Sequence, residues 1–340
     1  MPISIDDFGS TNDENISLIT IKLNSGFSAS FSQYGAAIVR IICKDIKGEF
    51  SDVVQGYDSV EGYVNGGSCQ GAVIGRFANR IANATIDIDN KKYQLNANCG
   101  KHLLHGGNVG FQNSIWEIES LGENFVEFSY LSQDMDAGFP GNLRVKVKYT
   151  VENDSVRIDY YAAADKKTAV NLTNHAYFNL SGKHDSQVND NILQIDADMI
   201  TIPDEMNVPT GEFKDVTETI FDFRKPRAIG ENSYDHNFVL NGFKGLENKD
   251  IFKASSLYDP KSGRIMHCYT NKPGIQVYTA NGLNEIGKGN VFMPSRSSIC
   301  LETQYFPDSP NQKSFPYKYL DIGEEYSFTT IYKFEVGKDL

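Results

Sequence analysis

Apolar and polar residues alternate with a period of two along much of the chain. In the segment from Leu143 to Val151 (LRVKVKYTV), apolar side chains take every second position, and basic or hydroxyl side chains fill the others. Successive side chains of a strand point to opposite faces, so this pattern predicts strands with one buried face. Further strand-like segments run over 17–23, 27–42, 124–131, 156–163, 191–202, 254–258, 264–270, 275–280, 297–306 and 326–336.

Turn signals separate these segments at short intervals. The clearest hairpin is expected from Thr85 to Leu95 (TIDIDNKKYQL), where Asp-Asn interrupts two alternating runs. No stretch keeps the helical period of about 3.6 residues, and no linker rich in Gly, Ser or Pro divides the chain. The sequence therefore predicts an all-β protein, a large antiparallel β-sandwich formed by residues 1–340 as a single domain.

Composition and charge limit the kinds of partner. With 40% hydrophobic residues, the chain can build a large core. A net charge of −12 argues against a nucleic-acid partner, which requires a basic face. No apolar run is long enough to span a membrane. The N-terminal MPISIDDFGS is acidic, and we expect no secretory signal there.

The cysteines point to a reducing environment. There are five of them, scattered and without a CxxC pair. Such usage is typical of free thiols, so we expect a cytoplasmic protein without disulfides. The six histidines form no HExxH or other ligand motif, and no metal site is predicted. GxGxxG, P-loop and GxSxG motifs are also absent, which argues against nucleotide cofactors and a serine nucleophile.

One segment, Val170 to Gly182 (VNLTNHAYFNLSG), combines strand-like alternation with an unusual polar face. If it is a strand, one face carries a row of polar side chains: Asn171, Thr173, His175, Tyr177 and Asn179. A polar face is often simply exposed to water. Here, however, it holds His, Tyr and amides rather than Lys and Glu, which suits the lining of a cleft.

Glu302 is a second unusual position. In SSICLETQYF its side chain shares a face with Cys300 and Gln304, between apolar neighbours. A buried carboxylate is costly unless it is paired or functional, although an exposed strand glutamate fits the pattern equally well. Taken singly, His175 could equally be a core histidine. Four further positions also have an ordinary surface or ion-pair interpretation: Arg80, Asp235, His236 and Gln276.

Together, several motifs resemble the aldose 1-epimerase (galactose mutarotase) family. The segments that carry the resemblance are GRFANRIAN (75–83), LHGG (104–107), DAGFPGNL (136–143), NLTNHAYFNLSG (171–182), FDFR (221–224), YDHNFVL (234–240), IQVYTAN (275–281) and LETQYFPDSPN (301–311). The combination of NHxYFNL with ETQ and PDSPN is specific, whereas LHGG alone is weak. The resemblance covers nearly the whole chain.

The resemblance implies a β-sandwich of the galactose mutarotase-like superfamily with a sugar cleft across one sheet. It implies that Glu302 is the general base and His175 the general acid for interconverting the anomers of free hexoses such as galactose and glucose. It also implies sugar contacts from a further group of side chains: Asn79, Arg80, His105, Tyr177, Asp235 and Gln276. Neither a cofactor nor a metal is implied.

Three other interpretations remain open at this point. A non-catalytic carbohydrate-binding module would need Arg80 and aromatic residues, but not both Glu302 and His175. A glycosidase or lyase would use two carboxylates flanking the bond, with Asp235 as the second. A hexose-6-phosphate epimerase would need clustered cations, and only Arg76 and Arg80 are close in sequence. The sequence identifies neither the preferred sugar nor the oligomeric state, which we expect to be monomer or homodimer.

Overall fold

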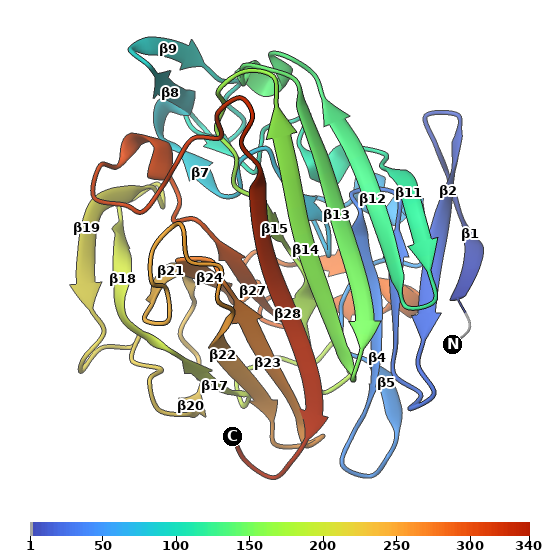
Figure 1. Cartoon of the computed structure of the whole chain (residues 1–340). Coiled ribbons are helices and arrows are strands. Elements are labelled where there is room, and N and C mark those ends of the chain that lie inside the picture. The colour runs from blue at the N-terminus through green and yellow to red at the C-terminus, as the bar shows by residue number, and fades with distance from the viewer. Residues whose placement is uncertain (1–2) are drawn as a thin grey trace.

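The computed structural model describes residues 3–340 and consists almost entirely of β-strands (Figure 1). Neighbouring strands in its sheets pair antiparallel, as the long β13–β14 and β14–β28 ladders illustrate. The all-β prediction is confirmed. Of the N-terminal segment expected not to be a secretory signal, residues 1 and 2 lie outside the described residues.

Three sheets hold most of the strands. The nine-stranded sheet has the order β11 (Glu117–Gly122), β12 (Phe125–Ser132), β13 (Leu143–Glu152), β14 (Ser155–Ala164), β28 (Tyr326–Val336), β23 (Arg264–Thr270), β22 (Phe252–Asp259), β17 (Ile192–Ile195) and β20 (Arg227–Ala228). The six-stranded sheet has the order β16 (Tyr177–Phe178), β27 (Ile299–Gln304), β24 (Gly274–Tyr278), β21 (Asp235–Leu240), β18 (Ala197–Pro203) and β19 (Pro209–Asp215). The five-stranded sheet runs in chain order: β1 (Ile3–Thr11), β2 (Glu14–Lys22), β3 (Ser28–Ser32), β4 (Ala37–Lys44) and β5 (Phe50–Asp52).

Short elements connect and cover these sheets. Two-stranded pairs join β6 (Val73–Ile74) with β15 (Thr173–Asn174), β7 (Arg80–Ile81) with β10 (Leu103–Leu104), β8 (Thr85–Ile88) with β9 (Lys91–Gln94), and β25 (Glu285–Ile286) with β26 (Phe292–Met293). The helical elements are α1 (Val60–Asn65) and the 3-10 turns η1 (Ala82–Ala84), η2 (Phe111–Asn113), η3 (Asp136–Gly138), η4 (Lys288–Asn290) and η5 (Ser309–Asn311). No helix within residues 3–340 is long and apolar enough to cross a membrane.

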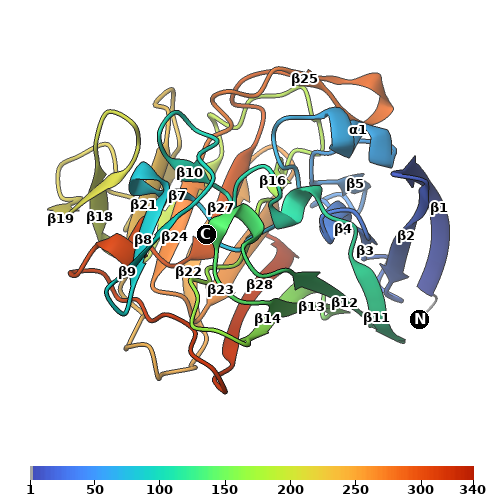
Figure 2. The ribbon, with the colours of Figure 1, turned by 90° about the horizontal axis from the view of Figure 1, so that it is seen from above.

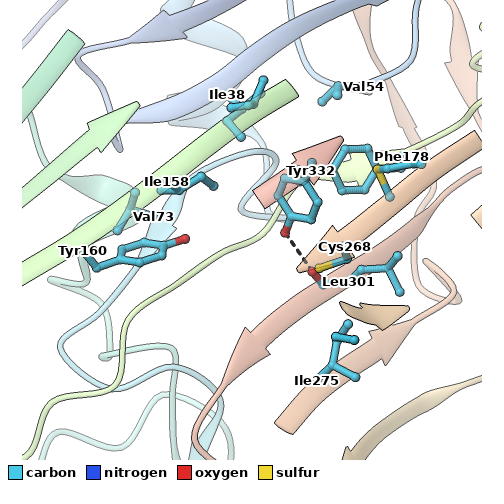
Figure 3. Close-up of a cluster of buried hydrophobic side chains, with 14 of the residues drawn as sticks. Ile38, Val54, Val73, Ile158, Tyr160, Phe178, Cys268, Ile275, Leu301 and Tyr332 are labelled. Atoms are coloured by element: carbon cyan, nitrogen blue, oxygen red, sulfur yellow. Dashed lines mark hydrogen bonds between the residues drawn. The ribbon is translucent and has the colours of Figure 1, made fainter. Parts of the chain in front are cut away.

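The view from above shows the nine-stranded sheet facing the other two (Figure 2). A large apolar core draws side chains from these sheets. Its side chains come from all three sheets, for example Ile38 on β4, Ile158 on β14 and Ile275 on β24 (Figure 3). Burial of this apolar surface is the main force that holds the layers together. The alternation seen in sequence explains it, because β13 buries its apolar positions and turns Arg144, Lys146 and Lys148 outward.

The fold departs from the sequence-based expectation in several places. The segment 170–182 is not one strand but two short pieces, β15 and β16, joined by irregular backbone. Its amides are buried and anchor loops: Asn174 donates to the carbonyl of Gly71, and Asn179 donates to that of Ser297. β1, β19 and α1 were not predicted, because their polar or irregular sequences carry no clear apolar period.

Candidate active site

The six-stranded sheet presents polar side chains from three neighbouring strands on one face. Glu302 on β27 lies directly opposite Gln276 on β24, and Gln276 lies opposite Asn237 on β21. Directly paired residues of antiparallel strands point to the same side of the sheet. Asp235 shares that side with Asn237 because the two are separated by one residue. Segments far apart in the chain therefore contribute to one polar surface.

Glu302 and His175 meet at this surface. The Nε2 atom of His175 lies 3.6 Å from the Oε1 atom of Glu302, and the side chains are only 7% and 2% exposed. The backbone around His175 is held on both sides, since its N–H donates to the carbonyl of Ala72 and its carbonyl accepts from the N–H of Gly71. The structure thus brings together the two residues that the sequence singled out as an acid–base pair.

Two buried tyrosines, Tyr332 and Tyr177, contact this pair or the backbone next to it. Tyr332 on β28 donates its hydroxyl to the carbonyl of Leu301, the residue before Glu302, at 2.8 Å (Figure 3). The ring of Tyr177 stacks on the imidazole of His175, with centroids 5.0 Å apart. Tyr177 in turn donates its hydroxyl to the carbonyl of Ser68. Its observed contacts are therefore with the protein, and its ring also forms part of the cavity wall.

A second polar cluster lies around Asp235. The Nε2 atom of Gln276 donates to Oδ1 of Asp235 at 2.6 Å, and Nη1 of Arg80 lies 3.9 Å from Oδ2. Nε of Arg80 and Oε1 of Gln276 are buried without hydrogen-bond partners, so each side chain can form a further hydrogen bond. Unpaired buried polar atoms are unfavourable in an empty protein, so this cluster is suited to receive a polar ligand.

Asn79 and His105 form a third group. The N–H of Asn79 donates to Nδ1 of His105, and the N–H of His105 donates to the carbonyl of Asn79. Because Nδ1 accepts a hydrogen bond, a neutral His105 carries its proton on Nε2. Burial lowers the pKa of His105 well below its ordinary value, and the neighbouring His175 and Arg80 lower it further.

Most of these groups line one open cavity of about 350 Å³. Its lining includes the predicted residues Asn79, Arg80, His105, His175, Tyr177, Asp235 and Glu302. Gln276 is absent from the lining and contacts Asp235 instead. Sequence reasoning missed other lining residues, namely Ser68, Cys69, Leu104, Tyr278, Leu283 and Glu285. Tyr278 could have been found, since it alternates with Gln276 on β24, whereas the loop residues carry no periodic signal.

Burial dominates the electrostatics of the central pair. It raises the pKa of the Glu302 carboxyl well above its ordinary value, and the charge of Asp235 adds to this, while Arg80 opposes it. Burial also lowers the pKa of His175 to about 4. Both effects favour neutral side chains. Burial therefore favours a protonated Glu302 beside a neutral His175, whereas a general base and a general acid act as an ionised Glu302 and a protonated His175.

The described part of the chain contains no cluster of side chains suited to a metal ion. Within residues 3–340, no three or more His, Cys, Asp or Glu side chains are grouped as a metal site. The five cysteines are unpaired, and Cys43, Cys268 and Cys300 are buried. The fold and cavity thus define a β-sandwich protein with a buried carboxyl–imidazole pair in a cleft rich in hydrogen-bonding groups.

The comparisons with known proteins agree with this class. The aldose 1-epimerase family model matches residues 17–333, and the chain belongs to that family. The galactose mutarotases of Bos taurus and Homo sapiens are each 42% identical over 313 residues, covering 89% of this chain and 90% of theirs. The crystal structure of an aldose epimerase homologue from C. elegans superposes with a TM-score of 0.88 at 30% identity, covering 94% of this chain and 98% of that one.

Proposed function

We propose that the protein is an aldose 1-epimerase that interconverts the α and β anomers of free hexoses such as galactose and glucose. The observation that carries the proposal is the 3.6 Å contact between His175 and Glu302 inside a polar cavity. The relatives named galactose mutarotase support the same reaction. We further propose that residues 1–340 act as one cytoplasmic domain, as monomer or homodimer.

The reaction needs two coupled proton transfers. One group takes the proton of the C1 hydroxyl while the other gives a proton to the ring oxygen, and the C1–O5 bond breaks to leave an aldehyde. Rotation about the C1–C2 bond presents the other carbonyl face. Reclosure reverses both transfers and yields the opposite anomer. Each positioned proton donor or acceptor contributes about 10²–10⁴-fold.

The pair suits this cycle because it holds one proton throughout. During ring opening an ionised Glu302 takes the C1 hydroxyl proton, and a protonated His175 protonates the ring oxygen. The pair is then neutral, which is the form that burial favours in the empty cavity. We propose that a bound sugar stabilises the ionised form, since its C1 hydroxyl donates to the carboxylate while its ring oxygen accepts from the imidazolium.

Arg80, Asp235, Asn79 and His105 are proposed to hold the sugar hydroxyls. Gln276 is proposed to contribute by holding Asp235. Hydroxyls both donate and accept, and this set offers both kinds of partner within one cavity. A carbohydrate-binding module would not need the buried acid–base pair as well.

A hexose-6-phosphate substrate is disfavoured. The guanidinium of Arg76 is buried and donates to Ser132 and to the carbonyls of Gln133, Pro140 and Gly141. Arg80 is thus left as the guanidinium in the cavity lining, together with Asp235, Glu285 and Glu302. Such a balance of charge favours a neutral sugar over a phosphate dianion.

Polarimetry tests the proposed function directly. Freshly dissolved α-D-galactose or α-D-glucose should reach anomeric equilibrium faster with the protein than without it, in proportion to its concentration. Incubation with oligosaccharides should release no reducing ends, whereas a glycosidase would release them. Relaxation at the uncatalysed rate for a panel of free aldoses would contradict the proposal.

The pH dependence of catalysis should reflect the shared proton. Addition of a second proton inactivates the pair once His175 is protonated, and its pKa is lowered to about 4. Loss of the only proton inactivates it above the raised pKa of Glu302. We therefore expect a bell-shaped profile of kcat/KM with an acid limb near pH 4, measured by polarimetry after subtraction of the uncatalysed rate. An acid limb at the ordinary pKa of histidine would contradict the assignment.

A further inference from the structure

The turn between β18 and β19 reaches the cavity at Asp235. Asn207 lies in this turn, and its amide nitrogen donates to Oδ2 of Asp235 across 3.4 Å. Asn207 is not part of the cavity lining, so an effect on a bound ligand has to pass through Asp235. None of the sequence motifs that carry the family resemblance includes this residue.

Asp235 is held from three directions. Gln276 donates to one carboxylate oxygen at 2.6 Å, and Asn207 and Arg80 face the other oxygen. A carboxylate offers about four acceptor positions. These neighbours therefore fix the plane of the carboxylate and still leave acceptor capacity toward the cavity.

The strand order places Asp235 away from the acid–base pair. β27 carries Glu302, β24 follows it, and β21 carries Asp235. Neighbouring strands are about 4.8 Å apart, so β21 runs roughly 10 Å from β27. In the proposed reaction C1 and the ring oxygen face Glu302 and His175 from the cavity. Asp235 then faces the hydroxyls on the side of the sugar ring remote from C1.

Hydrogen bonds within the turn define its backbone conformation. Oδ1 of Asp204 accepts from the N–H groups of Met206 and Val208, at 2.8 and 2.9 Å. Asn207 has a φ of 60°, a left-handed conformation that Asn, Asp and Gly tolerate better than other residues. The amide of Asn207 is therefore presented from a defined backbone position.

The same turn is tied to the strand that carries Arg80. Gln312 donates to the carbonyl of Pro209, next to the turn, and to Oδ2 of the buried Asp308. The N–H of Asp308 donates to the carbonyl of Arg80, and its Oδ1 accepts from the N–H of Ala82. The two partners of the Asp235 Oδ2 atom are thus positioned through a common buried residue.

We propose that Asn207 is a positioning residue that orients Asp235 toward the sugar hydroxyls remote from C1, and so helps to set which aldoses bind. This inference rests on the proposed function. It assigns Asn207 an effect on sugar affinity rather than on the proton transfers. Hexoses that differ at those hydroxyls, such as galactose and glucose, should therefore respond differently to its replacement.

Two variants are compatible with the left-handed backbone at position 207. Asn207→Gly removes the donor, and Asn207→Asp places a carboxylate beside Asp235. Loss of one hydrogen bond, about 0.5–1.5 kcal/mol, corresponds to a rise in KM of about 2- to 10-fold. Asn207→Asp should raise KM about tenfold or more, since it replaces a hydrogen-bond donor by an acceptor that faces the acceptor oxygen of Asp235. For both variants kcat should stay within about twofold of wild type, because the acid–base pair is untouched.

Steady-state polarimetry with galactose, glucose and their monodeoxy derivatives gives the readout. The increase in KM should vanish for the deoxy sugar that lacks the hydroxyl bound by Asp235. Met206→Ala, a change to the exposed neighbour on the same turn, serves as the matched control and should leave KM unchanged. Unchanged KM in both active Asn207 variants, or a fall in kcat alone, would overturn this inference and leave the proposed function standing. A wild-type protein without mutarotase activity would overturn both.

Discussion

Glu302→Gln is expected to lower kcat for mutarotation by about 10²–10⁴-fold. Glutamine keeps the size of the side chain but cannot exchange a proton with the C1 hydroxyl. The hydrogen bonds to the sugar from the Asp235 and His105 groups are unaffected, so sugar binding, measured by calorimetry, should change far less than kcat. Near-wild-type turnover would remove Glu302 from the proposed mechanism.

Glu285→Gln is the matched control for this variant. Glu285 is the other glutamate in the cavity lining, but it accepts from the hydroxyls of Ser68 and Tyr57 rather than facing His175. We expect it to keep most of the wild-type kcat. A loss as large as that of Glu302→Gln would show that general disturbance of the cavity explains both results.

Glu302→Gln should also stabilise the fold at neutral pH. The pKa of Glu302 is raised in the folded state, so the folded protein binds more protons than the unfolded chain above pH 4.5. Stability of the wild type therefore falls as pH rises through this range. Glutamine does not titrate, so the thermal midpoint of Glu302→Gln should exceed that of the wild type at pH 7.5, and the difference should shrink toward pH 4.5.

His175→Asn is expected to lower kcat by a similar factor, about 10²–10⁴-fold, because the ring oxygen loses its proton donor. The acid limb of the pH profile should disappear with it, since that limb is assigned to His175. His175→Ala with added imidazole offers a second readout, as a free imidazole in the vacated space should restore part of the rate. Retention of the acid limb in His175→Asn would refute the assignment.

His267→Asn provides the control for histidine replacement. His267 lies on β23 in the nine-stranded sheet, bonded to Ser256 and Glu335, outside the cavity lining. It should behave as wild type.

The double variant Glu302→Gln/His175→Asn should have a kcat little lower than that of either single variant, because two groups that transfer protons as a unit show non-additive losses. Additive losses would indicate independent roles.

The strands were largely predictable because each depends on a local period. β13, β24 and β28 lie where the alternation predicted them, with differences of one or two residues at their ends. The segment 170–182 was predicted less well, since the backbone there follows hydrogen bonds to distant loops, such as that from Asn174 to Gly71. A local pattern cannot encode partners that are about a hundred residues away in the chain.

The candidate site also combines features that the local sequence predicts with features that depend on tertiary structure. His175 and Glu302 stood out in the sequence as polar groups within apolar runs, and the motif resemblance connected them. Their separation, their shared burial and therefore the position of their proton depend on how β16 and β27 pair. Glu285 and Asn207 were invisible in the sequence, because polar residues in a two-residue strand or a turn carry no periodic signal.

By itself the sequence determined the all-β architecture and the family, and it singled out the two residues proposed as the acid–base pair, because side-chain period and residue type are local properties. Only the tertiary structure decided that Gln276 donates to Asp235, that Arg76 is buried away from the cavity, and that burial raises the pKa of Glu302 and lowers that of His175. These properties depend on distance and desolvation, which arise when strands far apart in the chain pack together.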